Sequence, residues 1–129
     1  MTVLVTGGAG YIGSHVARLL LERGSKVVIA DDLSTGLPSR LANIEHVQLD
    51  LASPDAVQQL RSIIQVHSID SVIHLADRKK VGESVDLPEW YYQQNIGGLA
   101  NLLEAMKAEQ VTRLVFSSSA ATYGMPDVA

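Results

Sequence analysis

The stretch that decides the fold is the first fourteen residues, Met1-Thr-Val-Leu-Val-Thr-Gly-Gly-Ala-Gly-Tyr-Ile-Gly-Ser14. Its apolar run, Val3 to Val5, predicts a buried strand, and an amphipathic helix is predicted to follow the glycines. Between these two elements lie Gly7, Gly10 and Gly13, spaced three residues apart. A strand, a glycine-rich turn and a helix in this order present backbone N–H groups and the positive end of a helix, which together favour binding of a phosphate group.

Each of the three glycines has a separate predicted role. Gly7 allows the chain to turn sharply, Gly10 allows the backbone to approach a pyrophosphate, and Gly13 allows the helix to pack closely on the strand. The spacing Gly-x-x-Gly-x-x-Gly differs from the Gly-x-Gly-x-x-Gly of most dehydrogenases. A turn that binds no ligand is the alternative interpretation.

Five strands are predicted to alternate with helices along the chain. The strands are expected at residues 3–5, 26–30, 46–50, 71–75 and 112–116. Helices are expected at residues 11–23, after a Ser53 N-cap with Pro54 in the first position, and from about Pro88 to Glu109. This alternation predicts an α/β fold of Rossmann type, a doubly wound parallel sheet of about five strands in the order 3-2-1-4-5, forming one domain over residues 1–129.

The composition excludes several classes of protein. A net charge of −4 and the lack of a basic stripe argue against a general nucleic-acid binder. The sequence has no cysteine, and its four histidines show no metal-ligand spacing, so neither a disulfide nor a metal site is predicted. No apolar run reaches membrane-spanning length, and the N-terminus enters a strand with no room for a signal peptide. We therefore expect a cytoplasmic protein that binds neither nucleic acid nor membrane.

Polar residues follow every predicted strand. They are the glycine turn, Asp31, Asp50, the loop Asp77-Arg-Lys-Lys80 and the run Ser117-Ser-Ser119. Ligands of parallel α/β sheets bind outside the carboxyl ends of the strands, near the point where the strand order reverses. We therefore expect a binding site where these residues converge.

Asp31 lies eighteen residues beyond Gly13, at the end of the second predicted strand. A carboxylate there can accept hydrogen bonds from the adenosine ribose hydroxyls and repels a 2′-phosphate. No arginine stands near it in the sequence, so NAD is favoured over NADP. The alternative is that Asp31 simply ends a strand. The next residue, Asp32, is interpreted as a solvated turn residue.

For three further residues the sequence is compatible with two roles. Asp50, with Leu51, is placed to approach the adenine edge or merely to end a strand. Lys79 is placed to reach a phosphate or a ribose hydroxyl, or to be solvated in its loop. Asn95 is placed to hold a backbone group or the cofactor.

Ser119 is the candidate catalytic hydroxyl, because a donor at the end of the fifth strand faces the nicotinamide and can stabilise an alkoxide or carbonyl oxygen. Its usual proton-transfer partner is a tyrosine followed four positions later by lysine. The residues four positions after the tyrosines Tyr11, Tyr91, Tyr92 and Tyr123 are His15, Asn95, Ile96 and Asp127. The pair is absent from this sequence.

A resemblance to a known family rests on motifs that occur in order at familiar spacing. They are Thr6-Gly-Gly-Ala-Gly-Tyr-Ile-Gly-Ser-His15, Val72-Ile-His-Leu-Ala76, Val81-Gly-Glu-Ser84, Tyr91-Tyr92 with Asn95, Phe116-Ser-Ser-Ser-Ala120 and Tyr123-Gly124. Over essentially its whole length the chain resembles the N-terminal part of the UDP-glucose 4-epimerases, which are extended short-chain dehydrogenases/reductases. The Val-Gly-Glu-Ser stretch is more specific to epimerases than the glycine motif.

The resemblance implies a tightly held NAD that takes a hydride from sugar C4, gives a 4-keto intermediate and returns the hydride to the other face. It implies a UDP-sugar as a partner of the full-length parent. By motif position the expected cofactor contacts are Gly7, Gly10, Tyr11, Ile12, Gly13, Asp31, Asp50, Leu51, Leu75, Ala76, Lys79, Asn95 and Ser117. Ser119 is the implied catalytic residue.

The sequence departs from the family pattern in three places. Asp77 stands where relatives carry a small residue, and its carboxylate would repel the cofactor unless Arg78 or Lys79 pairs with it. The run Asn95-Ile-Gly-Gly-Leu99 places two adjacent glycines in the long helix. The chain ends before the Tyr-x-x-x-Lys helix and the substrate domain, so it is expected to be incomplete at the C-terminus and inactive as an isolated fragment. A fifth strand left bare on one apolar face predicts self-association as a homodimer.

Two alternatives to the epimerase interpretation remain. The first is the NAD-binding part of another extended-family nucleotide-sugar dehydratase or reductase. The second is a non-enzymatic dinucleotide-binding module.

Overall fold

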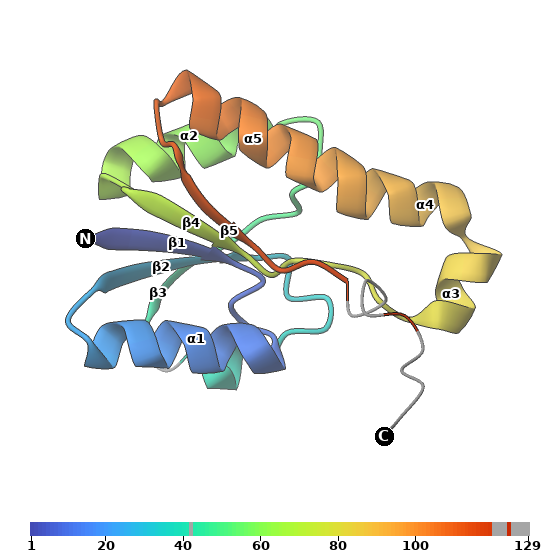
Figure 1. Ribbon diagram of the computed structural model, residues 1–129, viewed down its shortest axis with the longest axis horizontal. Coiled ribbons are helices and arrows are strands. Elements are labelled where there is room, and N and C mark those ends of the chain that lie inside the picture. Colours follow the sequence, from blue (N-terminus) through green and yellow to red (C-terminus); the bar gives the residue numbers. More distant parts are fainter. Residues whose placement is uncertain (42, 120–123, 125–129) are drawn as a thin grey trace.

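The computed structural model describes residues 1–41, 43–119 and 124, and its centre is a parallel sheet (Figure 1). The strands are β1 (Thr2–Thr6), β2 (Lys26–Asp31), β3 (Glu45–Gln48), β4 (Ser71–His74) and β5 (Arg113–Phe116). All neighbours pair in parallel, in the order β3-β2-β1-β4-β5. The predicted Rossmann-type sheet and its strand order are therefore confirmed.

Helices cover both faces of the sheet, as Figure 1 shows, with α2 and α5 on one face and α1 on the other. The elements outside the sheet are α1 (Tyr11–Glu22), the 3₁₀ turn η1 (Pro38–Arg40), α2 (Ala56–His67), α3 (Val81–Asp86), α4 (Pro88–Tyr92), the π-helical turn η2 (Gln93–Gly97) and α5 (Gly98–Ala108). The short helix α3 was not anticipated from the sequence.

The core is divided by the sheet into two halves, because successive residues of a strand point to opposite faces. On one side, Leu4 and Val72 pack with Leu60 of α2 and Leu102 of α5. On the other side, Val3, Val5 and Ile29 pack with Ala17 of α1. The central strand β1 is thus buried on both faces, which explains its uninterrupted apolar sequence.

The start of α2 differs from the prediction. The helix begins at Ala56 with Asp55 as its N-cap, two residues later than a Ser53 cap would place it. The Ser53 hydroxyl donates to Asp55 Oδ1 at 2.9 Å, and the Ser53 carbonyl accepts from the Ala56 N–H at 3.1 Å. The Ser53 carbonyl thus closes a turn and its hydroxyl is bonded to the Asp55 carboxylate. Ser53 therefore does not cap the helix.

The long helix predicted from Pro88 to Glu109 is present as α4, η2 and α5 in succession, ending at Ala108. Its widened π turn contains Asn95 and ends at the glycine pair Gly97 and Gly98. A Cβ on Gly98 would lie 3.1 Å from Leu51 Cβ, so this glycine allows the helix to approach the segment after β3. The second glycine is therefore a packing requirement as well as a weak helix former.

The last strand, β5, is covered on one face only. Leu114 packs against the core formed with α2 and α5. Val115, which points to the opposite face, is 61% exposed, because α1 packs against β1 and β2 there. Phe116, at the end of the strand on the Leu114 face, is 51% exposed and stacks on His74. The expectation of a bare apolar face at β5 is met within the described residues.

A buried polar pair crosses the centre of the sheet and makes stability depend on pH. A hydrogen bond of 2.7 Å joins Thr6 Oγ1 to His74 Nδ1, and His74 is only 4% exposed. Burial lowers the pKa of His74 from its ordinary 6.5 to about 4. The unfolded chain therefore takes up a proton below pH 6.5 that the folded chain does not accept until about pH 4.

We expect His74 to lower the free energy of unfolding by roughly 3 kcal/mol as the pH drops from 6.5 to about 4. Chemical denaturation over this pH range measures the effect. His74→Asn should lose most of the dependence, whereas the exposed control His46→Asn should keep it. Equal profiles for the native chain and His74→Asn would contradict this origin.

Candidate functional site

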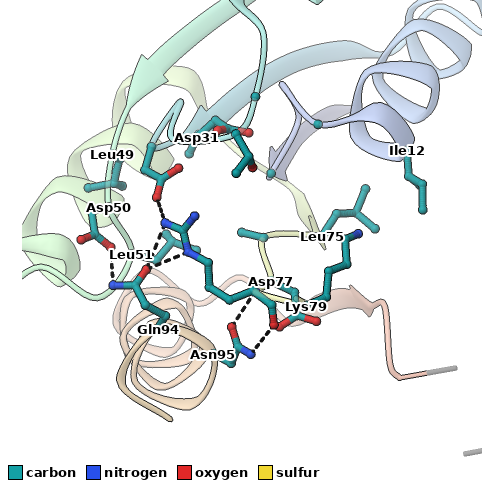
Figure 2. Close-up of a pocket in the computed structure, with 18 of the residues that line it drawn as sticks. Ile12, Asp31, Leu49, Asp50, Leu51, Leu75, Asp77, Lys79, Gln94 and Asn95 are labelled. Atoms are coloured by element: carbon teal, nitrogen blue, oxygen red, sulfur yellow. Dashed lines mark hydrogen bonds and ion pairs between the residues drawn. The ribbon is translucent and has the colours of Figure 1, made fainter. Parts of the chain in front are cut away.

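A cavity of about 400 Å³ opens at the carboxyl ends of β1, β2 and β4. In Figure 2, Leu49, Asp50 and Leu51 lie on one side of it, and Ile12, Leu75 and Lys79 lie on the other. Its wall includes these residues predicted to contact a cofactor: Gly7, Gly10, Tyr11, Ile12, Asp31, Asp50, Leu51, Leu75, Ala76, Lys79 and Asn95. The structure therefore brings most of the candidate residues together, at the predicted switch point of the sheet.

Three candidates lie elsewhere. Gly13 is buried beneath the turn, where a Cβ would stand 2.1 Å from the Gly7 carbonyl oxygen, so it has the predicted packing role rather than a place in the wall. Ser117 continues the ladder between β4 and β5, because its N–H donates to the His74 carbonyl at 3.1 Å. Ser119 is exposed beyond the end of β5. Tyr123, in the last motif of the sequence, lies outside the described residues.

The glycine turn forms a cradle with backbone donors. Gly7 has φ +76°, and a Cβ there would lie 2.6 Å from the Ala76 backbone nitrogen, so the turn requires glycine and touches the loop after β4. Gly10 is the N-cap of α1, and the first helical bond runs from the Ser14 N–H to the Gly10 carbonyl at 3.0 Å. The N–H groups of the first helical turn therefore lack intrahelical partners and point toward the cavity end of α1, as an anion site requires.

Asp31 ties the two sides of this cradle together. Its Oδ2 accepts from the Ala9 N–H at 2.9 Å, and its Oδ1 accepts from the Leu33 N–H at 2.8 Å. The side chain is buried, and a Cβ on the neighbouring Gly36 would lie 3.1 Å from Asp31 Oδ1. Asp31 thus does more than end a strand, because it joins the glycine turn to the loop after β2.

Asn95 acts on the backbone of the loop after β4. Its Oδ1 accepts from the Arg78 N–H at 2.8 Å, and its Nδ2 donates to the Arg78 carbonyl at 2.9 Å. The Tyr91 hydroxyl accepts from the Lys80 N–H at 3.1 Å in the same loop. The interpretation of Asn95 as a holder of backbone is therefore the one that the structure supports directly, although the side chain also lines the cavity.

The interpretation of Asp32 as a solvated turn residue is wrong. Asp32 forms an ion pair with the Arg78 guanidinium and accepts from the Ser34 N–H at 2.9 Å and the Ser34 hydroxyl at 2.6 Å. Partial burial alone would raise the pKa of Asp32, but the Ser34 hydrogen bonds and the positive charge of Arg78 hold it below its ordinary value. Asp32 is therefore a charged side chain that is bound to Arg78 and Ser34.

Although no arginine is near Asp31 in the sequence, Arg40 and Arg78 both line the same cavity as Asp31 in the structure. Arg78 lies 46 residues from Asp32 in the sequence, on the loop after β4. In the sequence, Arg78 belongs to the basic run Asp77-Arg-Lys-Lys80, which the predicted strand order places beside β1. From there its long side chain reaches the loop after β2.

Asp77 lines the cavity and forms no ion pair with the residues that the structure describes. Burial raises the pKa of its carboxyl, and the charge of Lys79 only partly opposes that shift. Within the described residues, neither Arg78 nor Lys79 forms an ion pair with it, because Arg78 is directed to Asp32. The pairing that would neutralise Asp77 is thus not found.

The sequence reasoning did not name several residues of the wall, which are Ala30, Thr35, Gly36, Arg40, Leu49 and Gln94. Ala30 and Leu49 belong to predicted strands that end at the site, and Thr35 and Gly36 lie a few residues beyond Asp31, so widening the predicted clusters would have included these four. Across the described ranges, no group of three or more acidic, histidine or cysteine side chains is placed to hold a metal ion. In the same ranges, no helix is both long and apolar enough to cross a membrane.

Comparisons with known proteins agree with this geometry. The NAD-dependent epimerase/dehydratase family matches residues 3–128. The UDP-glucose 4-epimerase of Halalkalibacterium halodurans is 46% identical over 126 residues, which cover 98% of this chain and 37% of that protein.

Two solved structures show the same likeness. The UDP-glucose 4-epimerase of Stenotrophomonas maltophila, with bound NAD and formylated UDP-arabinopyranose, has a TM-score of 0.91 and 42% identity over 98% of this chain and 39% of that chain. The enzyme of Brucella ovis in complex with NAD has a TM-score of 0.89 and 41% identity over 98% of this chain and 38% of that chain. This chain spans less than two fifths of the length of these relatives. It belongs to the NAD-dependent epimerase/dehydratase family.

Proposed function

We propose that residues 1–129 form the NAD-binding part of a nucleotide-sugar 4-epimerase that interconverts UDP-glucose and UDP-galactose. The observation that carries the proposal is the match between the cavity wall and the family motifs. The glycine turn, Asp31, the residues after β3 and the loop after β4 enclose one cavity, and the same chain is 46% identical to a UDP-glucose 4-epimerase. Several solved relatives hold NAD, among them the Brucella ovis and Thermus thermophilus enzymes.

The residues present fit a dinucleotide. The backbone at Gly7 and Gly10 leaves space beside the start of α1, and the N–H groups of the first turn of α1 lack intrahelical partners, which suits a pyrophosphate. Asp31 is placed to accept the ribose hydroxyls, since a carboxylate at the end of the second strand has that role in such folds. Leu51 is buried in the cavity wall, on the side where the adenine edge is expected.

Bound NAD would accept a hydride from the sugar and return it. The protein would bind the cofactor, position its loops and hydrogen-bond the sugar. The backbone donors of the cradle bind the pyrophosphate, and the Asn95 clamp holds the loop after β4 in place. The Ser119 hydroxyl would donate a hydrogen bond to the sugar oxygen whose charge changes during the reaction. Ser117 is proposed as a cofactor contact beside it.

We further propose a cytoplasmic location and self-association as a homodimer. Support for association comes from the apolar side chains of Val115, Phe116, Ile96 and Leu103, which are 45–61% exposed.

Calorimetric titration with NAD and NADP tests the cofactor assignment. We expect saturable binding of NAD, much weaker binding of NADP, and a loss of about tenfold or more in NAD affinity for Asp31→Ala. Because Asp31 also holds the Ala9 and Leu33 N–H groups, the variant should unfold at lower denaturant concentration. The nearly isosteric Asp31→Asn separates the two effects, and unchanged NAD affinity in both variants would contradict the ribose role.

A chimera tests the epimerase assignment. In it, this chain replaces the matching N-terminal segment of the Halalkalibacterium halodurans enzyme. The chimera should convert UDP-galactose to UDP-glucose, and Ser119→Ala should lower kcat by about 10²–10³-fold. The neighbouring Ser118→Ala is the matched control and should retain activity. A chimera that binds NAD but leaves UDP-galactose unchanged would reject the epimerase assignment in favour of another family activity.

Asp77 is expected to weaken cofactor binding through repulsion of the pyrophosphate. Asp77→Asn should raise NAD affinity at pH 7 by about two- to fivefold. Because the carboxylate loses its charge as the pH falls through its raised pKa, native NAD affinity should rise on acidification while that of Asp77→Asn stays flatter. Titrations at several pH values, with the exposed Asp86→Asn as charge-matched control, measure this. Weaker binding by Asp77→Asn would show that the carboxylate helps to hold the cofactor.

A further inference from the structure

A compact cluster of Asp32, Ser34 and Arg78, here called the Asp32 cluster, borders the cavity next to Asp31. Asp32 Oδ2 pairs with Arg78 Nη2, and Asp32 Oδ1 accepts from the Ser34 hydroxyl at 2.6 Å. Arg78 Nη1 donates to the same hydroxyl at 2.5 Å. The Arg78 and Asp32 side chains are 18% and 26% exposed, so the cluster is largely sheltered from water.

The donors of this cluster are those that a phosphate monoester prefers. A guanidinium binds phosphate oxygens through two parallel N–H groups, and a serine hydroxyl adds a further donor. Arg40 lies on the same cavity wall, and its side chain makes no hydrogen bond or ion pair with the residues that the structure describes. The cavity wall therefore carries two guanidinium groups, and the Ser34 hydroxyl is bonded to one of them, that of Arg78.

The position of the cluster matches a 2′-phosphate rather than the pyrophosphate. The pyrophosphate belongs over the glycine turn, whereas the ribose belongs at Asp31. Asp32 and Ser34 lie within three residues of Asp31 in the loop after β2, and in NADP-binding folds a nearby arginine accommodates the 2′-phosphate. In this chain the nearby arginine, Arg78, comes from the loop after β4, and Asp32 binds both it and the Ser34 hydroxyl.

We propose that Asp32 is a specificity-determining residue, which restricts the cavity to dinucleotides with a free ribose 2′-hydroxyl by occupying Arg78 and Ser34. The cavity thus contains a phosphate subsite that is filled by the protein's own carboxylate. This inference rests on the proposed NAD site. It adds to the repulsion from Asp31, whose two oxygens are already bound by the Ala9 and Leu33 N–H groups.

Arg78 remains beside the cavity without Asp32, because other contacts hold it. Its guanidinium carbon lies 5.1 Å from the centroid of the Trp90 ring, and Asn95 fixes its backbone on both sides of the peptide unit. Removal of the Asp32 charge should therefore leave an arginine in place with free donors. A ligand phosphate can then replace the carboxylate.

The test is calorimetric titration of the chain with NAD and with NADP. Asp32→Asn should bind NADP at least about tenfold more tightly than the native chain, with NAD affinity within about threefold. The double variant Asp32→Asn/Arg78→Gln should lose the gain. Asp86→Asn, an exposed residue at the end of α3, removes the same charge elsewhere and should leave both affinities unchanged. The gain should shrink as salt is added.

The outcomes separate the two claims. Native chain that binds neither dinucleotide would reject the proposed function and this inference together. If Asp32→Asn binds NAD normally but gains no NADP affinity, or if the gain survives Arg78→Gln, only this inference is overturned. Circular dichroism reports whether each variant folds, and Asp32→Ser, which keeps an acceptor for the Ser34 N–H, replaces Asp32→Asn if the latter does not.

Discussion

Two loops of the pocket meet on the carboxylate of Asp31. One oxygen accepts the Ala9 N–H of the glycine turn at 2.9 Å, and the other accepts the Leu33 N–H of the loop after β2 at 2.8 Å. Hydrogen bonds to an ionised acceptor are among the stronger ones in proteins, and this carboxylate is buried. The shape of the cradle and the negative charge on this side of the cavity therefore depend on the same side chain.

The sheet places this carboxylate where it can act. Because β1 lies between β2 and β4, the turn that follows it contacts the ends of both neighbours. The Gly7 N–H donates to the Ala30 carbonyl at 2.9 Å, while the other side of Gly7 leaves no space for a Cβ beside Ala76. The cradle is thus fixed by backbone contacts from three strands, and the helix α1 starts from a rigid turn.

The sequence predicts the strands, their order and most of the cavity wall, because these follow from local patterns. Apolar runs and glycine spacing are short-range signals, and Asp31 or Lys79 is found by its place at a strand end. The pairing of Asp32 with Arg78 joins residues 46 positions apart, and no local pattern encodes the direction of a long side chain. The late start of α2 has a similar origin. The Ser53 hydroxyl can bond either a helix N–H or the Asp55 carboxylate, and the sequence pattern does not show that it bonds the carboxylate.

The side-chain charges around the cavity indicate whether side chains or backbone dipoles attract a pyrophosphate. Asp31, Asp32, Asp50 and Asp77 line it together with Arg40, Arg78 and Lys79. Because Arg78 is engaged by Asp32, the side chains as a group offer a dianion little net attraction. Attraction must then come from fixed dipoles, chiefly the N–H groups of the first turn of α1, since the Gly7, Ala9 and Gly10 N–H groups already donate within the protein. Such donors need no counter-charge, so a pocket rich in carboxylates remains able to bind a dinucleotide.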